Sequence, residues 1–208
     1  MKVIVLSSLS YSLTNFRGNL LREIKANNHE VIAVAPDHDP AVEKELTKAG
    51  ISFRTIPMER AGTNPFADFS LFLAYVWMMV RERPQLVLAY TQKPIIYGGL
   101  AARICAVPRY FALMSGLGHV FSPGSNSSAL VKLMVKRLYR SAVRRARAIF
   151  VFNADDRQDM LDLAIFDPDQ KVIQVPGSGV DLKKYARHPL PKGATSFIKI
   201  ARLLRNKG

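Results

Sequence analysis

The sequence predicts an α/β protein with a doubly wound, mostly parallel sheet. Short apolar runs rich in β-branched residues alternate along the chain with longer segments of helical periodicity. The runs are continuously apolar rather than alternating in polarity, which is typical of strands that helices cover on both faces. Regular alternation of strand and helix places such strands in one parallel sheet.

Seven segments are expected as strands, and they cover residues 3–6, 31–35, 51–56, 86–89, 110–113, 149–152 and 172–175. Six are expected as helices, and they cover residues 15–26, 41–49, 66–83, 95–105, 129–147 and 154–163. Right-handed crossovers place the carboxyl ends of all the strands at one edge of the sheet, where ligands of open α/β sheets bind. We therefore expect the functional site in the loops that follow the strands.

The end of the chain has the composition of a domain boundary. Residues 187–196 hold two prolines and a glycine, and an apolar run followed by a basic loop comes after them. Residues 1–186 are predicted to form one domain and residues 187–196 a linker. Residues 197–208 are predicted to be the truncated start of a second α/β domain.

The charge of the chain points to an anionic partner. The formal net charge is +14, and residues 83–154 contain eleven Lys and Arg but no Asp or Glu. The apolar stretch of residues 3–6 is too short for a signal peptide, and residues 66–80 are too few to span a bilayer. The single cysteine, Cys105, is compatible with a reducing compartment. We therefore expect a cytoplasmic protein, peripheral on the inner face of the cell membrane.

The segment 129–147 carries most of this charge, and its cations are predicted to face an anionic membrane surface. They are Lys132, Lys136, Arg137, Arg140, Arg144 and Arg147. The apolar side chains expected to pack on the sheet are Leu130, Met134, Val135, Leu138 and Ala142, while Phe121, Val131 and Tyr139 are expected near the lipid interface. An ordinary amphipathic helix with solvated charge is the alternative. Nucleic-acid binding is disfavoured, because no aromatic residues interleave the cations and no known motif is present.

Three loops carry candidate ligand-binding residues. After the first strand, Asn15 is a candidate helix cap, and Arg17 and Gly18 follow where a helix N-terminus attracts anions. After the fourth strand, Thr91 and Lys93 offer a hydroxyl and an ammonium group for sugars and phosphates. The alternatives are an arginine that decorates a helical turn and a polar exposed turn.

The loop after the fifth strand is the third candidate. Ser115 precedes Gly116 and Gly118, which suit a sharp turn with accessible main-chain N–H groups. His119 follows as a candidate base or hydrogen-bond donor, with a plain turn and a surface histidine as the alternative. We expect Arg17, Lys93 and His119 to converge at the sheet edge. No set of residues predicts a metal site or a bound cofactor.

The chain resembles retaining glycosyltransferases of family 4 in four stretches that follow the family's order. They are YTQKPIIYGGLAARICAVP, SGLGHVF, VPGSGVDLKKY and IARLLRNKG. The resemblance implies the GT-B fold, in which two Rossmann-like domains face a cleft. The first domain binds the acceptor and the second the nucleotide-sugar. Arg202 and Lys207 would then bind the donor diphosphate.

The resemblance further implies a reaction. The nearest subgroup is similar to bacterial enzymes that extend polyisoprenyl-diphosphate-linked glycans, with retention and without a cofactor. Its implied partners are a nucleotide-sugar donor, a lipid-diphosphate saccharide and an anionic membrane, and its implied role is cell-surface polysaccharide or glycan biosynthesis. His119 would be catalytic, although Ser115 stands where many relatives have histidine. Without the second domain, the chain alone is expected to be inactive. The rival hypothesis is a non-catalytic acceptor- or membrane-binding module.

Overall fold

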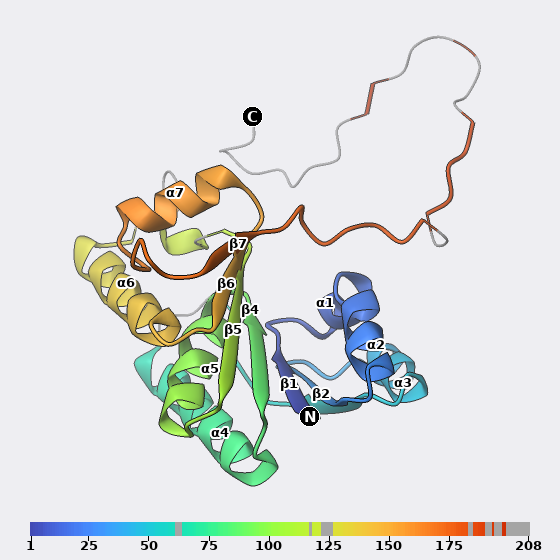
Figure 1. Ribbon diagram of the computed structural model, residues 1–208, viewed down its shortest axis with the longest axis horizontal. Helices are drawn as coiled ribbons and strands as arrows, with labels where there is room; N and C mark the ends of the chain where they lie inside the picture. Colours follow the sequence, from blue (N-terminus) through green and yellow to red (C-terminus); the bar gives the residue numbers. More distant parts are fainter. Residues whose placement is uncertain are drawn as a thin grey trace.

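The computed structural model describes residues 1–60, 64–116, 118–121, 127–182, 185–189, 193 and 197–198. A seven-stranded sheet runs through it in the order β3-β2-β1-β4-β5-β6-β7, and all neighbouring strands pair in parallel (Figure 1). The strands are β1 (Lys2–Leu6), β2 (Glu30–Ala35), β3 (Ser52–Thr55), β4 (Leu86–Tyr90), β5 (Arg109–Met114), β6 (Ala148–Val151) and β7 (Val172–Gln174). The predicted fold class and all seven predicted strands are confirmed.

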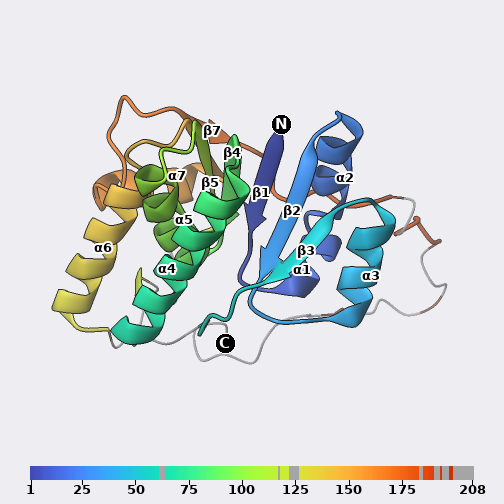
Figure 2. The ribbon, with the colours of Figure 1, turned by 90° about the horizontal axis from the view of Figure 1, so that it is seen from below.

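Helices cover the sheet in two layers (Figure 2). The first layer contains α1 (Ser10–Asn15), α2 (Gly18–Ala26) and α3 (Pro40–Lys48). The second contains α4 (Pro65–Glu82), α5 (Gln92–Ile104), α6 (Ala129–Val143) and α7 (Ala154–Asp162). A short 3-10 turn, η1 (His119–Phe121), follows β5. The layers explain the continuous apolar strands, because in β1 Val3 and Val5 face the first layer while Ile4 and Leu6 face the second.

The first predicted helix differs from the structure. The segment expected as one helix over 15–26 forms two helices that meet at Phe16 and Arg17. Helix α1 begins early because the Ser10 main-chain N–H donates to Asp37 Oδ1 at 2.9 Å, which holds the turn after β1. Asn15 therefore ends α1 and does not cap a helix.

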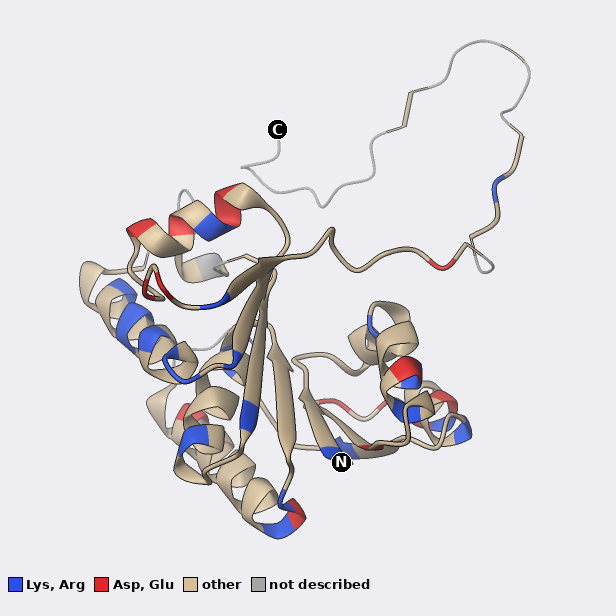
Figure 3. Cartoon of the chain, viewed as in Figure 1, with Lys and Arg blue, Asp and Glu red and all other residues tan. Residues whose placement is uncertain are grey.

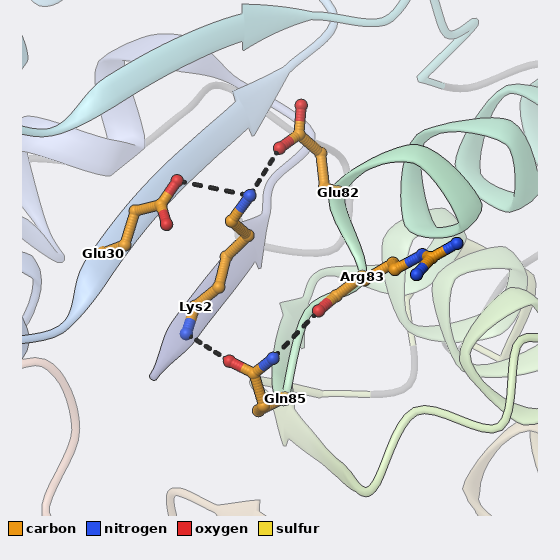
Figure 4. Close-up of polar contacts among 5 residues, drawn as sticks. All are labelled: Lys2, Glu30, Glu82, Arg83 and Gln85. Carbon is orange, nitrogen blue, oxygen red and sulfur yellow. Dashed lines mark hydrogen bonds and ion pairs between the residues drawn. The ribbon is translucent and has the colours of Figure 1, made fainter.

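The amino ends of the central strands are fastened to one another (Figure 4). The Lys2 ammonium contacts Glu82 Oε2 at 2.9 Å and Glu30 Oε1 at 3.3 Å. The Lys2 main-chain N–H donates to Gln85 Oε1 at 2.6 Å. The hydrogen bond to Glu82 raises the pKa of Lys2. These contacts join β1, β2 and the end of α4, so the polar side chains at this part of the amino edge are paired with one another. The candidate ligand-binding residues lie at the carboxyl edge.

The predicted linker, 187–196, and the predicted second domain, 197–208, fall largely outside the described residues. Arg202 and Lys207 lie wholly outside them.

The crossing of α5 over α6 generates a stability prediction at Gly99. A methyl group there would meet the Ala142 carbonyl oxygen and the Tyr110 ring, each at 2.9 Å. We expect Gly99→Ala to lower the free energy of unfolding by about 1–3 kcal/mol, measured by urea denaturation, because a main-chain atom cannot move aside.

Gly98→Ala is the matched control. Its methyl group would press on the end of the buried Leu6 side chain and not on a main-chain atom, and the helical gain of alanine over glycine, about 1 kcal/mol, is the same at both positions. The expected loss is therefore smaller. Equal losses for the two variants would contradict the assigned α5–α6 contact.

Candidate functional site

The order of the strands reverses between β1 and β4. The chain leaves β1 toward α1 in the first helix layer and leaves β4 toward α5 in the second. The two connections diverge to opposite faces, which opens a crevice at the carboxyl edge, the usual ligand position in such sheets. The candidate site is built around this point.

A buried chain of hydroxyl groups joins the two strands at the crevice. Ser7 Oγ lies 2.8 Å from Ser12 Oγ, which lies 2.9 Å from the Tyr90 hydroxyl. Burial raises the pKa of Tyr90, so the phenol stays neutral. This network holds the start of α1 against the end of β4 and makes the wall of the crevice rigid.

Arg17 is a buried cation above this network. Its side chain is 7% exposed, and its guanidinium carbon lies 5.1 Å from the centre of the Tyr90 ring and 5.7 Å from that of Phe152. Nη1 donates to Ser178 Oγ at 2.8 Å and to the Phe16 carbonyl oxygen at 3.2 Å, while the buried Nε has no hydrogen-bond partner among the described residues. Burial lowers the pKa of Arg17, although a guanidinium remains charged at neutral pH.

No described carboxylate forms an ion pair with Arg17. A desolvated charge of this kind is costly unless an anion or several hydrogen bonds compensate it. Arg17 can therefore bind a phosphate or a carboxylate of a ligand that enters beside Tyr90.

A cavity of about 910 Å³ opens next to Arg17. Helices α1 and α2 form one wall, the apolar face of β4, β5 and β6 forms the other, and the segment after β7 closes one side. Of the predicted acceptor-binding residues, Asn15, Arg17 and Gly18 line this cavity. Sequence reasoning missed Tyr90, Phe152 and Ser178, because only the fold brings β4, β6 and the loop after β7 to Arg17.

Lys93 lies on the other face of the sheet. Its ammonium contacts Asp68 Oδ1 of α4 at 2.5 Å, and the Tyr97 hydroxyl donates to Asp68 Oδ2 at 2.9 Å. The expected convergence of Arg17 and Lys93 is therefore wrong, because α2 and α5 pack on opposite faces. Asp68 was the missed residue, and its signal was a lone acid inside a long apolar segment.

The turns after β4 and β5 pack together at the carboxyl edge. Thr91 has φ +70° and ψ 156°, a strained conformation for a β-branched residue. Gly116 and Gly118 have φ +105° and +79°, as the predicted sharp turn requires. A methyl group on Gly118 would come within 2.5 Å of Gln92 Oε1, the end of a flexible side chain, so the positive φ rather than this contact is what favours glycine here. Ser115 is exposed there, and the His119 side chain lies outside what the structure describes.

Helix α6 ends at Val143, earlier than the predicted 147, and the helix and the turn after it carry the predicted basic residues (Figure 3). Arg137, Arg140, Arg144 and Arg147 are exposed, whereas Lys132 and Lys136 are half-buried, and Arg140 pairs with Asp167 at 2.6 Å. The predicted apolar face is partly wrong. Val135 and Ala142 are buried, but Leu130 and Met134 are exposed, and Tyr139, expected at the lipid interface, is buried. The helix is rotated because Tyr139 and Val143 contact the core.

The described residues show neither a cluster suited to a metal ion nor a helix suited to spanning a membrane. They contain no group of three or more His, Cys, Asp or Glu side chains that could hold a metal ion. None of the helices they form is both long and apolar enough to cross a membrane.

The chain is similar to a curated glycosyltransferase. It is 23% identical over 185 residues to the N,N'-diacetylbacillosaminyl-diphospho-undecaprenol alpha-1,3-N-acetylgalactosaminyltransferase of Campylobacter jejuni. The match covers 89% of this chain and 48% of the relative, so the chain spans about half the length of that relative.

Solved structures share the fold at low identity. A glycosyltransferase from Rickettsia africae matches with a TM-score of 0.61 and 18% identity, over 89% of this chain and 45% of that one. Anabaena HepE in complex with UDP and glucose matches with a TM-score of 0.59 and 18% identity, over 91% of this chain and 47% of that one. UDP-N-acetylglucosamine 2-epimerases also share the fold, so the fold by itself does not decide the reaction.

A family model decides the membership. Residues 14–176 match the model of the glycosyl transferase 4-like domain, and this range contains β2 to β7, Arg17, the part of the cavity lining that precedes residue 177, and the turns after β4 and β5. Since the match covers most of the 208 residues, the protein belongs to the family of glycosyl transferase 4-like domains.

Proposed function

We propose that this chain is the acceptor-binding part of a retaining glycosyltransferase. The enzyme would transfer a sugar from a nucleotide-diphosphate sugar to a saccharide linked through a diphosphate to a membrane lipid, in the synthesis of a cell-surface polysaccharide or glycan. The family membership and the relative, whose printed name contains a diphospho-undecaprenol saccharide, support the reaction class. The observation that carries the proposal is the buried Arg17 guanidinium, which has no described carboxylate partner beside the cavity.

The cavity suits the head of such an acceptor. Arg17 would bind a phosphate oxygen, and a charge-assisted hydrogen bond in a desolvated site is stronger than one in water. Gly18 begins α2, so the helix N-terminus adds main-chain N–H groups without a side chain in the way. Asn15 and Ser178 offer an amide and a hydroxyl for sugar hydroxyl groups.

The turns at the carboxyl edge would face the donor. In this proposal Thr91, Ser115, Gly116 and Gly118 shape the wall near the reacting sugar, and His119 contacts the reacting atoms. Lys93 contributes through its ion pair with Asp68, which fixes the start of α5. Arg202 and Lys207 would stabilise the charge of the leaving diphosphate. The retaining outcome rests on the family resemblance.

A second domain would supply the rest of the donor site. The relative is about twice as long as the matched region, which supports a two-domain enzyme in which residues 1–186 form the first domain. The chain alone would then bind acceptor but not turn over. The same length relation also supports the second candidate, a separate acceptor- or membrane-binding module completed by another chain.

The location would be peripheral, at an anionic membrane surface. The lipid tail of the acceptor stays in the bilayer, so the protein has to approach the leaflet. The exposed arginines of α6 provide the electrostatic attraction in this proposal.

We expect the purified chain to bind undecaprenyl-diphosphate N-acetylglucosamine in detergent and to bind UDP-N-acetylglucosamine weakly, as measured by calorimetric titration. We also expect no transfer of labelled sugar between them. Failure to bind the lipid-diphosphate saccharide would contradict the acceptor assignment, whereas turnover by the chain alone would contradict the need for a second domain.

Arg17→Met tests the phosphate contact. It is expected to weaken binding of the lipid-diphosphate saccharide about tenfold to a hundredfold, because a charge-assisted hydrogen bond is lost from a desolvated site. The free energy of unfolding is expected to change by no more than about 1 kcal/mol, because the loss of the Ser178 hydrogen bond and of the ring contacts is offset by the removal of a desolvated charge that has no described carboxylate partner. Arg17→Lys keeps the charge but loses the planar guanidinium group. Its affinity for the lipid-diphosphate saccharide should therefore lie between that of the unaltered chain and that of Arg17→Met.

Arg54→Met is the charge-matched control for this experiment. Arg54 is exposed on β3, away from the cavity, so its loss should leave binding unchanged. Binding by Arg17→Met as tight as by the unaltered chain would refute the assigned role of Arg17.

A further inference from the structure

Helix α4 is apolar on both its inner and its outer face. Its inner face buries Leu71, Tyr75, Met78 and Met79 against the sheet. Its outer face exposes large side chains, namely Phe66 (82%), Phe69 (59%), Leu73 (48%), Trp77 (64%) and Val80 (60%). A helix on the surface of a water-soluble domain normally turns polar residues outward, so this face calls for a partner that excludes water.

The exposed side chains form one continuous stripe along α4. They follow one another at intervals of three or four residues, which places them on the same side of the helix. The row mixes two phenylalanines with a tryptophan, which Arg81 covers with its guanidinium carbon 5.3 Å from the ring centre. Aromatic residues flanked by arginine are typical of the interfacial region of a bilayer.

The acidic residues of α4 do not oppose an anionic partner. The helix has two, Asp68 and Glu82, and their side chains are 15% and 19% exposed. Each is neutralised by a lysine, Asp68 by Lys93 and Glu82 by Lys2. Because residues 83–154 contain no Asp or Glu, α5 and α6 add no negative charge beside α4, and the four aspartates of α7 lie against β6, near the edge of the sheet.

A basic pocket lies between α5 and α6 in the same layer. Arg103, Arg137, Arg140 and Arg144 surround a cavity of about 400 Å³, together with Ser141 and Asp167. Asp167 pairs with Arg140, and the other three arginines form no ion pair with the described residues. Several guanidinium groups around one small cavity are the donor set that a phosphate group requires.

Helices α4, α5 and α6 stand side by side on one face of the sheet (Figure 2). Ile104 at the end of α5 and Leu130, Leu133 and Met134 on α6 are also exposed. The outer surface of this layer therefore combines apolar side chains with unpaired cations. We call it the α4–α6 face.

We propose that the α4–α6 face binds an anionic lipid leaflet, with the α4 stripe lying among the acyl chains and the arginine pocket holding lipid phosphate groups. The inference rests on the proposed function, and it moves the main attachment from the basic row of α6 to α4. A second copy fits this face less well, because a two-fold contact would bring the arginines of both copies together. An anionic leaflet is complementary in charge to the arginines of this face, whereas a second copy is not.

Trp77 makes insertion directly measurable, because it is the only tryptophan of the chain. On mixing with vesicles of phosphatidylcholine and phosphatidylglycerol, its emission is expected to shift to shorter wavelength, and lipids brominated on the acyl chains are expected to quench it. Vesicle-bound protein whose Trp77 emission is neither shifted nor quenched would overturn the insertion of α4.

Two pairs of substitutions separate the two parts of the face. Phe69→Ser with Leu73→Ser is expected to weaken flotation with phosphatidylglycerol vesicles at least tenfold, because apolar insertion is lost. Arg137→Gln with Arg144→Gln is expected to weaken it about fivefold per arginine and to reduce its salt dependence. Arg54→Gln on β3, at the opposite edge of the sheet from α6, is the charge control and should leave flotation unchanged.

All of these side chains are exposed, so urea denaturation should show unchanged folding. Light scattering tests whether a second copy of the chain occupies this face instead. The proposal would be overturned if the unaltered chain is a dimer, if Phe69→Ser with Leu73→Ser makes it a monomer, and if both forms float equally well with the vesicles. Binding of a short-chain prenyl-diphosphate saccharide needs no membrane. If the unaltered chain binds this saccharide but does not float with phosphatidylglycerol vesicles, the inference is wrong and the proposed function is not affected. If it floats but does not bind the saccharide, the proposed function is wrong and the inference about the α4–α6 face is not affected.

Discussion

The parallel pairing of β1 with β4 is the constraint from which the rest of the structure follows. Val3 to Leu6 lie opposite Leu86 to Ala89, and both strands are buried. Two parallel strands cannot be joined by a tight turn, so each has to continue into a helix on one face or the other. Here they take opposite faces, and that divergence opens the crevice. The contacts of Lys2 with Gln85 and Glu82 hold the amino ends of the central strands together, whereas the crevice lies at the carboxyl edge.

The contrast between Arg17 and Lys93 shows how the same kind of charge comes to differ in role. Both leave the carboxyl edge near the crevice, and both side chains are largely buried. Lys93 has Asp68 as an ion-pair partner, so its charge serves the packing of α5 on α4. Arg17 has aromatic faces and a hydroxyl but no described carboxylate, so its charge remains available to an anion. The two side chains are similarly buried, and they differ in whether a described carboxylate neutralises the charge.

The sequence predicted the framework well, because the signals for it are local. Continuous apolar runs marked each strand, and two glycines marked the turn after β5. The parts that were wrong depend on distant pairing. Asp68 and Lys93 are 25 residues apart, and no local pattern states that α4 lies against α5. The buried side of α6 was misjudged by a fraction of a turn, because Tyr139 was read as interfacial although it packs in the core. The sequence identified residues 66–80 only as an apolar stretch too short to span a bilayer, since apolar residues alone do not tell which side of a helix meets the sheet.

The two proposed surfaces place geometric demands on each other. Parallel strands and the helices that return beside them run in opposite directions, so the first turns of α4 and α6 lie toward the carboxyl edge. Phe66 and Leu130, the most exposed apolar residues of these two helices, belong to those first turns. A leaflet that lies along α4 would therefore meet the protein beside the edge where the crevice opens. The diphosphate of a lipid-linked acceptor sits at the lipid surface, and from there its head group has to cross only the carboxyl edge to reach the first helix layer and Arg17. If both proposals hold, the sheet would separate the apolar tail from the saccharide, and its carboxyl edge would set the depth at which the reacting sugar stands above the leaflet.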